Sequence, residues 1–439
     1  MADVNSWRSL PLQDLEPQDC DLTANWAAKF LSTDDPPLLL TRNYLLSAVP
    51  ENWTDIPRHG ELMAWFTDKP SGEVKLFITK TLDHAVSYCK DKFCQHLGWE
   101  GDPDVFGIGV IISYHTVAAL SLLWFIAINV GDLPHMKGIS RGAKENTASR
   151  LLRGFQESAS DFLDATLVFS AAMQIAAITR YAPLFYDPKA DFSFYGLIGS
   201  IFMSTFTIFP CIVLQTVTDR MRRQWLRIFL WLVVIISSIT LKVLSDQLNL
   251  LDILDRAKSD SHTVKEVVWA ASCGDEERLR RLDGVGTLMH VWLALNLCWW
   301  LWYVGVSIVP QRWKDKHKTH RRYHLFKKAQ RVLLLLDGSA SIVIMYTCIG
   351  HFHGYNNHVR AVAGLDGDGK PARSEDADHS WTFGQVLALA TWIPVIIQLL
   401  SIIFYGKEGM SAKFSWRYEV VERENGDQSG KDAPMGSTP

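Results

Sequence analysis

Seven apolar stretches divide this chain, and they limit its possible folds more than any other feature. They cover residues 105–130, 163–181, 193–217, 225–244, 288–309, 332–350 and 383–405. A helix rises about 1.5 Å per residue, so each stretch has roughly the twenty residues needed to cross a hydrocarbon layer of about 30 Å, with few or no charges. Membrane-spanning strands would be shorter and would alternate apolar and polar residues. We therefore predict an all-α membrane protein with a bundle of seven transmembrane helices.

Basic residues are distributed unevenly among the connecting loops. The loops after the first, third and fifth stretches are rich in them, as in Arg220, Arg222 and Arg223, whereas the loop after the second has only Lys189. Cytosolic loops of membrane proteins carry an excess of Lys and Arg. We therefore predict an external or luminal N-terminus and a cytosolic C-terminus, with an extramembrane region over 1–104, the bundle over 105–405 and a disordered tail over 406–439.

The N-terminal region carries two signs of an oxidising compartment. The triplet Asn52-Trp53-Thr54 is an acceptor pattern for N-glycosylation, which predicts a glycoprotein modified at Asn52. Cys20, Cys89, Cys94 and Cys273 all fall on the predicted outer side. Four such cysteines allow two disulfides in three connectivities, and the sequence leaves the pairing open.

The remaining extramembrane sequence contains no catalytic motif. In the long loop between the fourth and fifth stretches, residues 267–279 are similar to the start of an ankyrin repeat, but no second copy occurs. We expect a short amphipathic helical hairpin there, resting on the membrane or the bundle. The net charge of −3 argues against nucleic acid as a partner. The expected partners are the lipid bilayer and a lipophilic small molecule.

Polar residues inside the apolar stretches are the candidates for chemistry, because an ionisable group in hydrocarbon is costly. Asp337 lies roughly two turns, about 9 Å, inside the sixth stretch, and Asp164 lies near the cytosolic end of the second. Asn129 and Gln398 reach a similar depth in the first and seventh. We predict a polar cluster that opens toward the cytosol, with Asp337 as an acid and Asp164 as its partner. The alternative is hydrogen bonding between helices that only holds the bundle together.

Tryptophan is concentrated in the fifth stretch. The chain has 17 Trp residues, and Trp299 and Trp300 lie deeper than an interfacial belt requires. Aromatic faces stabilise cations, so an aromatic cavity beside a carboxylic acid suits the protonation of an epoxide or alkene and the carbocation that follows. Packing against lipid is the alternative role for each Trp.

A metal site is the remaining possibility for chemistry near the outer side. His290, His351 and His353 lie at helix ends where three histidines can bind zinc. Seven-helix lipid hydrolases carry tightly spaced histidine and acidic motifs, which this chain does not have. We predict no metal and no cofactor.

Several motifs resemble those of known proteins. The segment Cys94–Asp104, reading CQHLGWEGDPD and leading into Gly107-Ile108-Gly109, resembles a group of largely uncharacterised multi-pass proteins of filamentous fungi. So do residues 161–165 and 171–176. The layout is similar to that of membrane-bound terpene cyclases of fungal biosynthetic clusters, a likeness of fold only. It implies a cyclase of secondary metabolism acting on a prenylated or terpenoid epoxide.

Two other functions remain open from the sequence. A receptor-like signalling protein is indicated by Asp219-Arg220 at the end of the third stretch, where G-protein-coupled receptors place an Asp-Arg pair. A transporter is the third possibility, although no inverted repeat is evident. We favour the cyclase, because a buried acid beside deep tryptophans explains more of the unusual residues.

Overall fold

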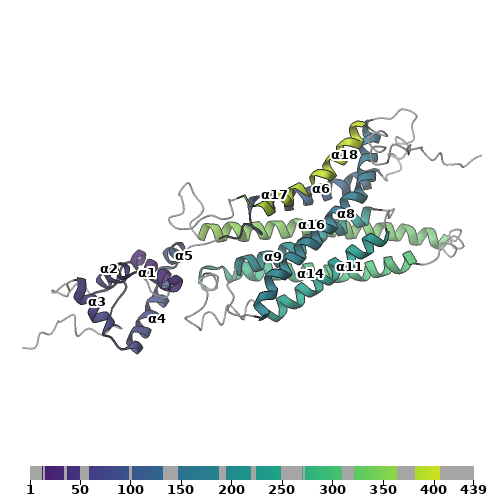
Figure 1. Ribbon diagram of the computed structural model, residues 1–439. Coiled ribbons are helices and arrows are strands. Elements are labelled where there is room, and N and C mark those ends of the chain that lie inside the picture. Colours follow the sequence, from purple (N-terminus) through teal and green to yellow (C-terminus); the bar gives the residue numbers. More distant parts are fainter. Residues whose placement is uncertain are drawn as a thin grey trace, which may run out of the picture.

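The computed structural model describes residues 12, 15–33, 37–49, 59–97, 101–131, 147–186, 194–218, 224–248, 269, 272–308, 321–362 and 381–405. Within these ranges the chain is almost entirely helical and has no strand. A small group of N-terminal helices lies at one end of a long helical bundle (Figure 1). The all-α class predicted from the sequence is confirmed for this part of the chain.

The described residues include seven helical spans that are long and apolar enough to cross a membrane. This confirms the predicted seven-helix pattern and is consistent with an integral membrane protein. In chain order the spans are α6 (Ile108–Gly131), α8 (Thr147–Tyr186), α9 with α10 (Phe194–Phe206 and Ile208–Val217), α11 (Gln224–Leu248), α14 (Glu276–Ile308), α16 (Arg321–Val362) and α17 with α18 (Phe383–Ala390 and Ile393–Tyr405).

The third and fifth spans differ in how deeply they are packed. In the apolar window of the third span 89% of the residues are buried, against 6% in the fifth. Helix α10 packs against α6, α8 and α16, while α14 packs on α16 and α9 at the periphery. The third span is therefore the centre of the bundle, and α14 is an outer wall.

The start of α14 differs from the expectation for the long loop. The helix begins at Glu276, so Leu279 belongs to its first turn and not to a separate hairpin. Asp275 precedes the helix, and its Oδ1 accepts hydrogen bonds from the backbone N–H groups of Glu277 at 3.0 Å and Arg278 at 3.4 Å. Desolvation opposes ionisation of this carboxyl, but the bonds to Arg278 and Glu277 outweigh it and hold the pKa of Asp275 below its ordinary value.

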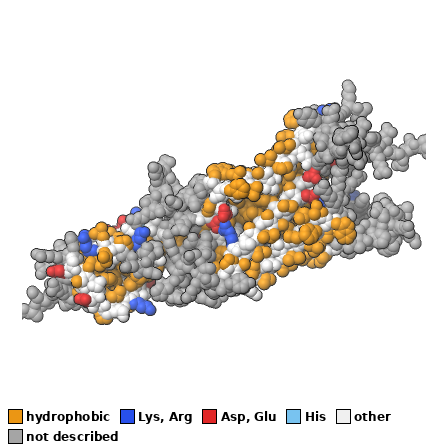
Figure 2. Space-filling view, viewed as in Figure 1, with side chains coloured by type: hydrophobic (Ala, Val, Ile, Leu, Met, Phe, Trp, Pro, Cys, Tyr) orange, Lys and Arg blue, Asp and Glu red, His pale blue; other side chains and the backbone are white. Residues whose placement is uncertain are grey.

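The outer surface of the bundle is apolar. Side chains that face outward include Phe229, Ile236, Val343 and Ile397, each more than half exposed. Figure 2 shows hydrophobic side chains covering the bundle, with charged side chains gathered near the two ends of this surface. A continuous apolar surface of this extent is unusual for a protein surrounded by water and suits a lipid environment.

The N-terminal region, expected only as a soluble tail, is a folded helical unit. It consists of α1 (Cys20–Thr33), α2 (Leu38–Ala48), α3 (His59–Thr67), α4 (Ser71–Tyr88) and α5 (Lys90–Leu97). Trp26 stacks on Tyr44 with ring centroids 5.0 Å apart, and Phe77 packs against both. Burial raises the pKa of Tyr44 to about 12, although its hydrogen bond with Thr81 acts in the opposite direction. These side chains form a hydrophobic core separate from that of the bundle.

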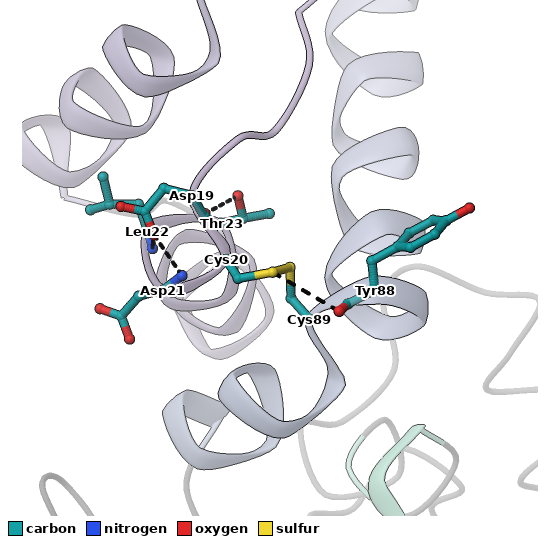
Figure 3. Close-up of a disulfide and its surroundings, with 7 residues drawn as sticks. All are labelled: Asp19, Cys20, Asp21, Leu22, Thr23, Tyr88 and Cys89. Atoms are coloured by element: carbon teal, nitrogen blue, oxygen red, sulfur yellow. Dashed lines mark hydrogen bonds between the residues drawn. A yellow bond between two sulfur atoms is a disulfide. The ribbon is translucent and has the colours of Figure 1, made fainter.

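Two disulfides fix this unit. Cys20, at the start of α1, is bonded to Cys89 just after α4, as Figure 3 shows. The side chain of Asp19 caps the same helix start by accepting a hydrogen bond from the N–H of Asp21 at 2.8 Å. A second bond joins Cys94 of α5 to Cys273, just before α14. The structure thus selects one of the three connectivities and ties the N-terminal helices to the outer wall of the bundle.

Candidate functional site

The bundle contains a cavity of about 1530 Å³ between the helices. One wall comes from α11 and another from α14, and α6, α8, α10 and α16 contribute the rest of the lining. Ligand pockets commonly measure about 300–1,000 Å³. The space is therefore large enough for a long lipophilic molecule.

Asp337 of α16 lines this cavity. Asn296 of α14 donates a hydrogen bond from Nδ2 to Asp337 Oδ1 at 3.2 Å and another to the backbone oxygen of Trp292 at 3.1 Å. Oδ2 of Asp337 is buried and has no hydrogen-bond partner among the described residues. A buried carboxyl oxygen without a partner is costly and calls for an explanation, of which a catalytic role is one. The free oxygen is available to a ligand.

The backbone beside Asp337 is held by close helix packing. A Cβ atom on Gly338 would clash with the ring of Phe125 on α6 and lie 2.8 Å from Oγ1 of Thr216 on α10. Phe125 and Thr216 both line the cavity. The absence of a side chain at Gly338 lets α16 approach these helices, which sets the position of Asp337.

Three tryptophans and Phe125 form the aromatic part of the lining. Trp299 and Trp300 come from α14, and Trp231 comes from α11. Trp231 donates its Nε1–H to Oε1 of Gln215 on α10 at 3.3 Å, which fixes the orientation of its ring. Aromatic side chains therefore face the same space as the Asp337 carboxyl.

Four of the six side chains predicted to form the site line the cavity: Asp337, Asn129, Trp299 and Trp300. Asn129 bonds its own helix, donating from Nδ2 to the backbone oxygen of Phe125 at 2.8 Å. Gln398 does not line the cavity, but donates to Oδ2 of Asp161, a lining residue, at 2.7 Å. Gln398 thus holds the side chain of a lining residue in place without lining the cavity itself.

Asp164 also lies outside the cavity lining. Its contacts show that it does not pair with Asp337, although the sequence analysis predicted this pairing. Oδ1 of Asp164 accepts a hydrogen bond from Nε of Arg227 at 2.6 Å. The same guanidinium donates to the backbone oxygen of Ser160 at 2.8 Å and to the Ser160 hydroxyl. Asp164 faces α11 because of the rotation of α8, while the partner of Asp337 is Asn296. The charge-assisted hydrogen bond between Asp164 and the buried guanidinium joins α8 to α11.

Arg227 and Asn296 were missed in the sequence analysis. Arg227 is completely buried, although it is only the third residue of the apolar stretch 225–244. Asn296 lies in the middle of the stretch 288–309. The principle that singled out Asp337 applies equally to both, because a polar side chain inside a span usually faces the protein interior. Their partners depend on helix rotation, which the sequence pattern does not determine.

Other predicted positions fall outside this site. Asn52 and the Asp219-Arg220 pair lie outside the described residues. Within the part of the chain that the structure describes, no three His, Cys, Asp or Glu side chains come together as a metal site. His351 and His353 do not line the cavity, whereas His290 does.

The chain matches no protein-family model, no curated protein and no solved structure with which it was compared. The resemblance to multi-pass proteins of filamentous fungi therefore stays a prediction, and arguments about function rest on the cavity itself.

Proposed function

We propose that this protein is a membrane-embedded cyclase that converts a lipophilic prenylated or terpenoid epoxide by acid-initiated carbocation cyclisation. The observation that carries the proposal is the free, buried Oδ2 of Asp337 in a cavity that Trp299 and Trp300 also line. An acid is needed to open an epoxide, and aromatic faces are needed to stabilise the cation that follows. Both are present on the walls of one cavity.

The reaction requires only a proton from the protein. In the proposal, Asp337 Oδ2 donates it to the epoxide oxygen, the adjacent carbon–oxygen bond breaks, and an alkene of the same chain supplies the electron pair for the new carbon–carbon bond. The hydrogen bond from Asn296 to Oδ1 holds the carboxyl in place and stabilises the carboxylate left behind. Trp299, Trp300 and Trp231 stabilise the moving positive charge.

The lining supports a lipophilic substrate that enters from the bilayer. Ile239 and Val243 of α11 line the cavity, yet are 54% and 49% exposed. Side chains that border both a cavity and the lipid-facing surface indicate an opening between the helices. An apolar prenyl chain partitions into the bilayer and reaches such an opening without crossing water.

The proposed orientation places the N-terminal helices outside the cytosol or in a lumen, and the C-terminus in the cytosol. Both disulfides lie at the end of the bundle where the N-terminal helices pack, and disulfides persist in oxidising compartments. We expect a reporter fused after Pro439 to be cytosolic and Asn52 to be glycosylated. A luminal reporter at Pro439 together with unmodified Asn52 would overturn this orientation.

The test of the proposed function uses purified protein in detergent. Its substrate is a farnesylated phenol in which the terminal double bond has been converted to an epoxide. We expect conversion to a cyclised isomer of the same mass without any added cofactor, because the reaction only rearranges bonds. A parallel extract from cells lacking the protein controls for spontaneous opening. Binding without conversion would contradict the cyclase and favour the receptor-like or transporter alternatives.

A further inference from the structure

A histidine that lines the same cavity as Asp337 has a free ring nitrogen. His290 of α14 lines the cavity, and its Nδ1 lies 2.7 Å from the backbone oxygen of Gly286. A carbonyl oxygen can only accept a hydrogen bond, so Nδ1 carries the ring proton. In the neutral imidazole Nε2 then holds the lone pair, and no described residue forms a hydrogen bond with it. His290 is thus a fixed tautomer with a free basic nitrogen.

His290 and the partner of Asp337 lie at different depths along α14. His290 lies six residues before Asn296, the partner of Asp337, which corresponds to about 9 Å along α14. The lining between the two positions includes Leu293, Ala294 and Leu297 of α14. An acid and a base therefore stand at separate points of one cavity, with apolar side chains between them.

An exposed ion pair lies near His290. Lys242 of α11 lines the cavity near this histidine and forms an ion pair with Asp246 at 2.5 Å. Asp246 is 59% exposed. A proton that reaches His290 therefore has a route to water at this end of the bundle.

We propose that His290 is the base that ends the reaction, an inference that rests on the proposed cyclase function. After ring closure, Nε2 removes a proton from the carbon next to the cation, and the electrons of that carbon–hydrogen bond form the final alkene. Asp337 has then lost one proton and His290 has gained one, so the product is an isomer of the substrate. Water near Asp246 then takes the proton from His290. Water that enters through the end of the cavity lined by Gln156 and Glu157 protonates Asp337 again.

The substitution His290→Ala tests this role with the same farnesylated phenol epoxide. We expect consumption of the epoxide to continue, because Asp337 still starts the reaction, while the share of the main alkene falls by at least about tenfold. Alkene isomers and the water adduct should take its place, since the cation then loses its proton elsewhere or is captured by water. His290→Gln, which keeps a polar side chain, should change the product distribution in the same way. It replaces the alanine variant in the test if that variant does not accumulate in membranes.

A matched control is available on α6. His115 bonds the backbone oxygen of Ile111 through Nδ1 at 2.9 Å, as His290 bonds Gly286, but it does not line the cavity. His115→Ala should leave the product distribution unchanged. An unchanged distribution in both His290 variants would overturn the inference and leave the cyclase standing, whereas a wild-type protein that does not consume the epoxide would overturn both.

Discussion

Replacing Arg227 by Met should destabilise the bundle strongly, because Arg227 joins α11 to α8 from a completely buried position. The guanidinium forms three hydrogen bonds, to Asp164, to the Ser160 backbone and to the Ser160 hydroxyl. Hydrogen bonds between membrane helices contribute on average about 0.6 kcal/mol each, which gives roughly 2 kcal/mol for the three. Removing one partner of a buried ion pair costs about 3–5 kcal/mol, because the remaining charge is left unpaired.

We therefore expect Arg227→Met to lower the free energy of unfolding by about 2–4 kcal/mol, within the range that these two estimates give. At roughly 2–4 °C per kcal/mol, the melting temperature should fall by roughly 4–16 °C. In the assay, detergent-solubilised protein is heated to a series of temperatures, and size-exclusion chromatography measures the fraction that stays folded.

The control for this substitution is an ion pair at the surface. Arg281 pairs with Glu277, and their side chains are 60% and 73% exposed. Exposed pairs contribute little, so Arg281→Met should leave the melting temperature almost unchanged. Adding Asp164→Asn to Arg227→Met should recover part of the loss, because it removes the unpaired carboxylate. Equal melting temperatures for Arg227→Met and wild type, or purely additive losses in the double variant, would refute the reasoning.

Two further predictions concern stability. Cys94→Ser breaks the bond to Cys273 that ties the N-terminal helices to α14, and should lower the free energy of unfolding by about 2–4 kcal/mol in oxidised protein, with no difference from wild type after reduction. Gly338→Ala should lower the free energy of unfolding by about 1–3 kcal/mol, because the new methyl group clashes with the ring of Phe125. Gly286→Ala, where nothing lies within 4 Å of the added atom, should instead stabilise α14 by up to about 1 kcal/mol. The melting temperatures of the two glycine variants should therefore move in opposite directions.

The seven spans could be predicted because hydropathy and length are properties of each segment by itself. Their internal breaks near Thr207 and Thr391 were not predicted, although Pro210 and Pro394 each lie three residues further along and cannot donate the backbone hydrogen bond to Phe206 and Ala390. The start of α14 at Glu276 was not predicted either. Its first turns are charged and precede the apolar stretch 288–309.

The candidate site could be predicted in part. Depth along a helix follows from residue count, and it selected Asp337, Asn129, Trp299 and Trp300, all of which line the cavity. Rotation about the helix axis decides which neighbour a side chain meets. Asp164 therefore faces Arg227 instead of Asp337, and no count along the chain distinguishes the two outcomes.

The N-terminal unit was the largest structural difference from the sequence prediction. Only packing in three dimensions joins Trp26, Tyr44 and Phe77, which lie on three different helices, into a core. The cysteines indicated that disulfides would form, but the pairing depends on which helix ends meet. The bond from Cys94 to Cys273 spans 179 residues of sequence, and the spacing of the cysteines alone does not select it.

The central claim is that the Asp337 carboxyl starts the reaction, and its most direct test is the rate of epoxide conversion by Asp337→Asn. Asparagine keeps the shape of the side chain but has no acidic proton, so conversion should fall by at least about 100-fold while the protein accumulates in membranes at the wild-type level. Asp83→Asn, at an exposed position of α4 outside the cavity lining, should convert the epoxide at the wild-type rate. Full conversion by Asp337→Asn would contradict the account.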